Sequence, residues 1–394
     1  MFSSRIQSEL AKNRLTKALE RCRSRGDVFI DLTESNPTRA ALDYPDDLLA
    51  ALADSRGLVY TPEPFGTLEA RCAVAAEFGR RSLGVHPERI VLTASTSEAY
   101  SLLFKVLCNA GDEVLVPRPS YPLFEHLTAL DAIVARPYDL EYHGVWTIDF
   151  DSLERACSPS TRAVIIVSPN NPTGSFVKEH ELDRIAAVCA RHNAAIVADE
   201  VFAEYPLADD PAAASGQVLT RRDGLMFSLG GLSKSAGLPQ VKVGWIVCAG
   251  RDELVRDALG RLELACDSYL SVSTPAQVAL PDLLRRGADI RAQILARVRA
   301  NYRSLQARAA ATATCRVLAA EGGWYAVVQV PSLGPEEDLV IDLVERHGVL
   351  AHPGYFFDFP RESFLIVSLL VPETLFREGV SRLFGYFDCT LNAS

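Results

Sequence analysis

Short apolar runs and longer amphipathic stretches alternate through the middle of the chain. Between residues 55 and 280, valine- and isoleucine-rich runs of strand length recur, and the segments between them carry apolar residues at helical spacing. The runs cover residues 89–93, 113–117, 163–167, 194–199 and 244–247. This alternation predicts a mostly parallel sheet covered by helices on both faces, an α/β architecture.

The two ends of the chain show other patterns. Leucine and isoleucine at helical spacing (Ile6, Leu10, Leu15, Leu19) predict an amphipathic helix over residues 3–24. A charged helical pattern over 281–311 precedes strand-like runs at 324–330 and 364–370, which predicts an α+β lobe. We expect an N-terminal helix and arm (1–45) that joins a small α+β domain (281–394), and a large domain (46–280) between them.

Composition narrows the class of protein. Hydrophobic residues make up 48% of the 394 residues and the net charge is −10 without a basic face, so we expect a globular protein without a nucleic-acid partner. The nine cysteines are scattered and form no Cys-x-x-Cys pair, which argues against disulfides and a metal site. No apolar signal core or membrane-spanning stretch is visible, so we expect no membrane association and a cytoplasmic location.

Four polar segments stand out, three of them directly after predicted strands, where ligands bind in open α/β sheets. They lie in segments 93–98, 168–174, 199–200 and 230–235. Each segment taken alone has a purely structural interpretation: a turn, a helix cap or a solvated lysine. Their order and spacing carry more information than any one of them.

The series Ser168-Pro-Asn-Asn-Pro-Thr-Gly174, Asp199-Glu200 and Ser233-Lys234, with Gly244-Trp245 ten residues beyond the lysine, resembles the class I/II aminotransferases. These are pyridoxal-phosphate (PLP) enzymes of fold type I, and the resemblance covers residues 31–371. It implies a large domain with a mostly parallel seven-stranded sheet, a smaller α+β domain, and transfer of an amino group from an amino acid to a 2-oxo acid.

The resemblance assigns residues to the cofactor ring. Lys234 would form the imine with the PLP aldehyde and move the substrate proton. Asp199 would keep the ring nitrogen protonated, Asn171 would donate to the phenolic oxygen, and Tyr121 would stack on the ring.

It also assigns residues to the cofactor phosphate. Ser95, Thr96, Ser97 and Ser233 match the phosphate-binding positions, and Lys242 stands where the family usually has arginine, which keeps the charge but loses the bidentate fork. Tyr60 matches the tyrosine that reaches the phosphate of the neighbouring subunit, which implies a homodimer.

At two positions this sequence lacks a functional side chain that the family normally has. Phe202 replaces the tyrosine that donates to the phenolic oxygen, so the imine should be less acidic unless Tyr205 substitutes. Ile366 stands where the family has the arginine that binds the substrate α-carboxylate. Arg39 is the first candidate to replace this arginine, because it lies in the stretch that lines the pocket in the family, together with Ser35 and Asn36. Arg361 is the second candidate. Both arginines also fit a role at the surface.

A third departure concerns the choice of substrate. Tyr269, before Ser273-Thr-Pro275, stands roughly where dicarboxylate-specific relatives place a second arginine, so neutral or aromatic amino donors are expected rather than aspartate. The aromatic residues that could line such a pocket, or simply fill the core, are Tyr269, Trp324, Tyr355, Phe356 and Phe357.

Two other functions fit parts of the sequence. A PLP-dependent lyase or cyclase on the same fold is compatible with the changes at Phe202 and Ile366. A ligand-responsive regulator on this fold would normally carry a DNA-binding module, and the sequence shows no basic helix-turn-helix segment.

Overall fold

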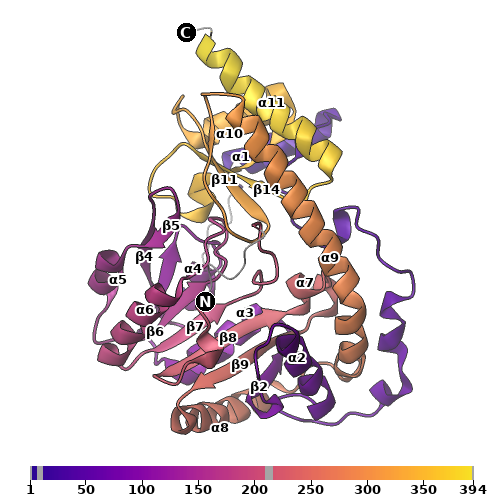
Figure 1. Cartoon of the computed structure of the whole chain (residues 1–394), viewed down its shortest axis with the longest axis vertical. Coiled ribbons are helices and arrows are strands. Elements are labelled where there is room, and N and C mark those ends of the chain that lie inside the picture. Colours follow the sequence, from indigo (N-terminus) through magenta and orange to yellow (C-terminus); the bar gives the residue numbers. More distant parts are fainter. Residues whose placement is uncertain (1, 7–11, 209–215, 393–394) are drawn as a thin grey trace.

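The computed structural model describes residues 2–6, 12–208 and 216–392. Its largest element is an eight-stranded sheet (Figure 1). The strands, in spatial order, are β2 (Ile90–Thr93), β9 (Gly244–Gly250), β8 (Leu225–Gly231), β7 (Ala195–Asp199), β6 (Thr161–Val167), β3 (Glu113–Arg118), β4 (Val134–Tyr142) and β5 (Trp146–Ile148).

The inner strands of this sheet are parallel. β4, β3, β6, β7 and β8 run in one direction, while β9 is antiparallel to both β8 and β2. The predicted α/β class is confirmed, with one strand more than the expected seven. The sequence pattern had not shown β4, β5 or β8; β5 pairs antiparallel with β4 and has three residues, too few to display an alternation.

Side chains on alternate residues of the strands build two cores, one on each face of the sheet. On β6, Val164 and Ile166 face one core and Ile165 and Val167 the other, as the period of two requires. The helices of this part of the chain are α2 (Leu68–Arg80), α3 (Thr96–Leu107), α4 (Phe124–Leu130), α5 (Phe150–Ala156), α6 (Glu179–His192), α7 (Leu232–Ser235) and α8 (Asp252–Tyr269).

A second, four-stranded sheet forms from the C-terminal part of the chain. Its spatial order is β10 (Arg316–Val317), β11 (Tyr325–Gln329), β14 (Phe364–Ser368) and β13 (His352–Pro353). The helices α10 (Glu336–His347) and α11 (Glu373–Asn392) lie with it in the upper half of Figure 1. The strand-like runs at 324–330 and 364–370 therefore correspond to β11 and β14.

The N-terminal arm joins this C-terminal part. β1 (Ile30–Asp31) pairs in parallel with β12 (Val349–Leu350). The helix predicted for residues 3–24 is shorter in the structure: α1 spans Arg14–Arg25, residues 2–6 are not helical, and Leu10 lies outside the described residues. The side chain of Asn13 accepts a hydrogen bond from the Thr16 N–H and so starts the helix there.

The long helix α9 (Thr274–Ala310) links the two sheets and runs from the lower to the upper half of Figure 1. It begins seven residues before the predicted 281, since Pro275 in its first turn is compatible with a helix start and Pro281 is accommodated inside it. The predicted domain limits remain a prediction. No helix in the described ranges is long and apolar enough to cross a membrane.

Short 3₁₀ turns connect many of these elements. They are η1 (Pro37–Arg39), η2 (Leu48–Ala53), η3 (Ser55–Leu58), η4 (Pro87–Arg89), η6 (Val218–Thr220), η7 (Pro239–Val241) and η8 (Gly354–Phe357).

Asn301 fixes α9 to the end of β14, and its loss should destabilise the fold. Its buried Nδ2 donates to the carbonyl oxygens of Leu369 at 2.8 Å and Val371 at 2.7 Å. Asn301→Ala leaves both buried carbonyls unpaired, so we expect the free energy of unfolding, measured in urea, to fall by about 2–4 kcal/mol. Arg303→Ala, at an exposed position of the same helix, is the control. A change of less than about 0.5 kcal/mol in Asn301→Ala would contradict the prediction.

Candidate active site

A cavity lies where the inner strands end. Because β3, β6, β7 and β8 are parallel, the residues after them meet at one edge of the sheet, and the second sheet contributes the opposite wall. The cavity volume is about 650 Å³. Ten residues predicted to bind the cofactor line it: Ser95, Thr96, Ser97, Tyr121, Asn171, Asp199, Phe202, Ser233, Lys234 and Lys242.

Lys234 lies on the one-turn helix α7, directly after β8. Two hydrogen bonds hold its backbone surroundings: the Tyr205 hydroxyl donates to the carbonyl of Lys234, and Arg291 Nη1 donates to the carbonyl of Ser235 at 3.0 Å. The Lys234 amine lies 5.0 Å from the centre of the Trp324 ring and 5.6 Å from that of Phe202. Burial lowers the pKa of this amine, although Asp199 opposes the shift, so the neutral nucleophilic form becomes more accessible.

Asp199 ends β7 and faces the same cavity. Its Oδ2 accepts a hydrogen bond from the Tyr100 hydroxyl at 3.0 Å, and its Oδ1 accepts one from the Val201 N–H at 3.2 Å. Burial raises the pKa of the carboxyl group to about 6, and these two hydrogen bonds lower it only in part. An ionised carboxylate at this position therefore lacks a strong cationic partner, and a protonated ring nitrogen would supply one.

The two asparagines of the 168–174 turn differ in their contacts. Asn170 is structural: its Nδ2 donates to the Pro119 carbonyl at 3.1 Å and to Thr173 Oγ1 at 2.9 Å. Asn171 lines the cavity, and its buried Oδ1 has no hydrogen-bond partner among the described residues. A buried amide oxygen without a partner is costly, so Asn171 has hydrogen-bonding capacity left for a ligand in the cavity.

The start of α3 forms another part of the cavity. Ser95 caps this helix by accepting a hydrogen bond from the Glu98 N–H at 3.1 Å, so the N–H groups of the first turn point toward the cavity end lined by Thr96 and Ser97. Gly244 explains part of the sequence motif: a Cβ on it would lie 3.0 Å from the backbone of Ser95. Lys242, in the left-handed region with φ of 61°, and Ser233 line the same cavity.

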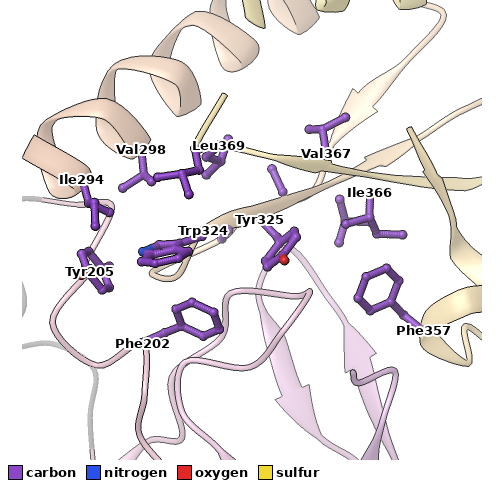
Figure 2. Packing of buried hydrophobic residues seen from close by; sticks show 14 of the residues in the cluster. Phe202, Tyr205, Ile294, Val298, Trp324, Tyr325, Phe357, Ile366, Val367 and Leu369 are labelled. Carbon is purple, nitrogen blue, oxygen red and sulfur yellow. The ribbon is translucent and has the colours of Figure 1, made fainter. Parts of the chain in front are cut away.

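Aromatic rings line part of the cavity. Three of them, Phe202, Tyr325 and Phe357, are seen in Figure 2 with the buried Trp324. Phe202 packs edge-on against Trp324, with ring centres 5.2 Å apart, and against Tyr325 at 6.4 Å. Tyr205 does not replace the missing hydroxyl of Phe202, because its own hydroxyl is bonded to the backbone of Lys234. Of the aromatic residues suggested from sequence, Phe356 and Phe357 line the cavity. Trp324 is fully buried outside the lining, and Tyr269 and Tyr355 lie at the surface, 60% and 39% exposed.

The predicted substrate-binding residues separate into two groups. Ser35 lines the cavity, but Asn36, Arg39 and Arg361 do not. Asn36 Oδ1 accepts hydrogen bonds from Thr38 and caps η1; this turn buries Pro37 and directs Arg39 outward. Arg361 is exposed in the loop before β14.

Tyr60 also lies outside this lining. Its side chain is exposed at the surface. Its contact with the phosphate of a neighbouring subunit stays a prediction.

Sequence reasoning missed several residues that line the cavity. They are Thr33, Tyr100, Ser120, Tyr325 and His352. Only Tyr100 had a local signal, since it lies four residues after Thr96 on the buried face of the helix that follows the predicted phosphate turn. The others reach the cavity through pairing in the second sheet or through loops.

Known proteins share this fold and sequence pattern. The model for "Aminotransferase class I and II" matches residues 27–383. Human tyrosine aminotransferase is 28% identical over 334 residues, which cover 82% of this chain and 72% of that protein. The glutamate-pyruvate aminotransferase AlaA of Escherichia coli K12 is 29% identical over 279 residues, covering 68% and 66% of the two chains. The structure of alanine aminotransferase from Pyrococcus furiosus superposes with a TM-score of 0.87 at 21% identity, covering 98% of this chain and all of that one.

With a lysine and a carboxylate facing one cavity at the strand ends, these matches show that the chain belongs to the class I and II aminotransferases. It is a transaminase that uses pyridoxal phosphate, acting on an amino acid and a 2-oxo acid. The predicted family, cofactor and reaction are confirmed, and these relatives do not favour the lyase or cyclase alternative.

The raised pKa of Asp199 predicts that the free energy of unfolding of the cofactor-free protein depends on pH. The unfolded carboxyl group ionises near its ordinary value of 3.8, whereas the folded one ionises near 6. Stability should therefore fall as the pH rises from about 4 to 6 and remain lower above that range. Asp199→Asn removes this loss of stability, so at pH 7.5 the cofactor-free variant should be roughly 1–3 kcal/mol more stable than wild type in urea unfolding.

The exposed Asp289→Asn is the control, since it lies outside the cavity and should leave the stability at pH 7.5 unchanged. Equal stability of wild type and Asp199→Asn at pH 7.5 would show that the Asp199 carboxylate is not strained by burial.

Proposed function

We propose that the residues around the cavity act on PLP and on a neutral or aromatic amino donor in a cytoplasmic homodimer. The observation that carries the proposal is the shared cavity of the Lys234 amine and the Asp199 carboxylate. PLP, when bound, withdraws electrons from the α-carbon of the amino donor. Lys234 Nζ, whose pKa burial lowers, accepts the α-proton and returns it, while Asp199 keeps the ring nitrogen protonated.

The remaining assignments follow the positions of side chains around the cavity. Asn171 donates its amide to the phenolic oxygen, and Tyr121 lies against the ring. Ser95, Thr96, Ser97, Ser233 and Lys242 hold the phosphate by N–H groups, hydroxyls and one positive charge. Phe202 offers only an apolar surface beside the ring.

The lining of the cavity supports a neutral or aromatic donor. Tyr325, Phe356 and Phe357 contribute rings, and no arginine is among the described lining residues. A second carboxylate on the donor would therefore be buried without a cation, which is expensive. The human relative is named for tyrosine and the bacterial one for glutamate and pyruvate, so both aromatic and small donors belong in a test.

A half-reaction screen of amino donors tests the donor class. The PLP-loaded protein is mixed with single amino acids, and the loss of the lysine-bound cofactor absorbance is followed over time. We expect phenylalanine, tyrosine or alanine to react at least tenfold faster per unit concentration than aspartate, because the side-chain carboxylate has no partner. Lys234→Ala should abolish the reaction and borohydride labelling, whereas Lys12→Ala, an exposed control, should retain both. A preference for aspartate would refute the donor class.

Exposed apolar side chains support the homodimer. Nine of those in the described ranges are at least 60% exposed, and six of the nine lie in two segments, 58–60 and 264–270: Leu58, Val59, Tyr60, Leu264, Tyr269 and Leu270. A Cβ on Gly57 would lie 3.2 Å from Pro275 in the first turn of α9, so the segment 57–60 lies close to the end of α8 and its following loop. Burial of such a patch by a second copy would also bring Tyr60 to the neighbouring phosphate site.

Leu58→Glu tests this surface, because it places a charge within the patch. We expect the variant to elute as a monomer in gel filtration with light scattering and to retain PLP at least tenfold more weakly, since the partner's contribution is lost. Val28→Glu is the matched control: Val28 is 90% exposed, just before β1 and outside the patch, so this variant should remain a dimer. A dimeric Leu58→Glu with normal PLP retention would exclude this surface.

The cysteines support a reducing compartment such as the cytoplasm. All nine are free thiols in the structure, and Cys72 and Cys389 are exposed. Exposed free thiols oxidise readily outside a reducing compartment.

A further inference from the structure

The cavity lacks the guanidinium that the family uses for the substrate carboxylate. Among the described residues that line it, three carry a nitrogen able to hold a positive charge: Lys234, Lys242 and His352. The proposed function uses both lysines for the cofactor. Arg118 lines an adjoining cavity, but Asp139 holds it at 2.7 Å. His352 is thus the remaining cationic candidate in the lining.

The sheet register places His352 beside the position where the family has its arginine. His352 on β13 pairs antiparallel with Ile366 on β14, and Ile366 pairs with Val327 on β11. Directly paired residues point to the same face of a sheet, with Cβ atoms about 4.5–5.5 Å apart. His352, Ile366 and Tyr325, two residues before Val327, therefore share one face, and His352 and Tyr325 line the cavity from it.

Ile366 itself is fully buried and lies with Phe357 and Tyr325 in an apolar cluster (Figure 2). β13 therefore places His352 next to position 366, where the family has an arginine and this chain has isoleucine. Cross-strand neighbours at this spacing reach the same volume above the sheet.

The imidazole of His352 is available to a ligand. It makes no hydrogen bond with any residue of the described ranges, and its ring centre lies 6.1 Å from that of Phe356 and 5.6 Å from that of Phe357. Burial lowers the pKa of His352 to about 4, and the Asp31 carboxylate on β1 opposes this shift. On the adjacent α10, Glu336 accepts hydrogen bonds from the N–H groups of Tyr355 and Phe364, and β14 carries no ionisable side chain.

We propose that His352 binds the α-carboxylate of the amino donor, in the role that an arginine at position 366 has in the family. The inference rests on the proposed function, because it requires an amino-acid donor. A carboxylate next to the ring favours the imidazolium form, so binding draws a proton to His352 and gives a charge-assisted hydrogen bond inside apolar walls. One imidazole N–H replaces the two parallel bonds of a guanidinium, so recognition is weaker than with arginine.

Paired substrates with and without a carboxylate test the inference. Phenylalanine is compared with phenethylamine, and alanine with ethylamine, in the half-reaction of the PLP-loaded protein. We expect His352→Leu to lower the second-order rate constant for the amino acids by about 10- to 100-fold, the range expected for a hydrogen bond to a charged group. The rate constants for the two amines should stay within about twofold, because the amines have no carboxylate to lose.

Two variants and one control sharpen the result. His352→Arg should keep amino-acid rates near or above wild type, and Ile366→Arg should restore them in the His352→Leu background. His143→Leu, an exposed histidine paired with Glu141, should change nothing. Calorimetry with 3-phenylpropionate gives a readout without turnover: binding to the loaded wild type should be lost in His352→Leu and regained in His352→Arg.

The outcomes separate the inference from the proposed function. Equal losses for amino acids and amines in His352→Leu would mean a structural role and overturn the inference, as would unchanged amino-acid rates. If wild type converted no amino acid, the proposed function would fail, and calorimetry with 3-phenylpropionate would still decide whether His352 binds a carboxylate.

Discussion

The site depends on one buried carboxylate that the chain by itself does not neutralise. Asp199 ends a central strand, where hydrogen bonds from Tyr100 and the backbone of Val201 offset only part of its desolvation. Lys234 faces the same cavity, but burial disfavours the charged form of its amine. The same burial therefore frees a nucleophilic amine and leaves an anion in need of a cation, which is the pair of properties that a pyridinium aldehyde can satisfy at once.

The second sheet completes the cavity and is held against the first by backbone hydrogen bonds. The Ser120 N–H donates to the Phe357 carbonyl at 3.0 Å, and the Gly174 carbonyl accepts from the N–H groups of Glu321 and Gly322, each at 2.9 Å. Gly174 has a φ of 72°, and a Cβ there would lie 2.6 Å from Ala320, so the turn that carries Asn171 is closed by the opposite sheet. The cofactor side and the substrate side of the cavity are in this way positioned by the same contacts.

Much of the cofactor side could be predicted from the sequence, and the substrate side could not. Asp199 and the turn that carries Asn171 directly follow predicted apolar runs, so their place at the strand ends is local information. Lys234 was placed by the family motif, because the sequence pattern did not show β8 before it. Arg39 was a reasonable substitute by sequence proximity, but the 3₁₀ turn that buries Pro37 faces it outward. His352 and Tyr325 meet only because β13, β14 and β11 pair in a given register, and no periodicity in two-residue strands reports that pairing.

The continuity of α9 limits how this protein can be recombined with its relatives. The pattern of predicted elements changes near residue 280, which makes that point attractive as a junction for chimaeras. The helix, however, runs unbroken from Thr274 to Ala310 and contacts η2, α2, α7 and α11. A crossover at residue 280 would join the first seven residues of the helix from one parent to the remainder from another, although their buried faces pack against different neighbours. Exchange of substrate-side segments should therefore keep α9 and its contacts from a single parent.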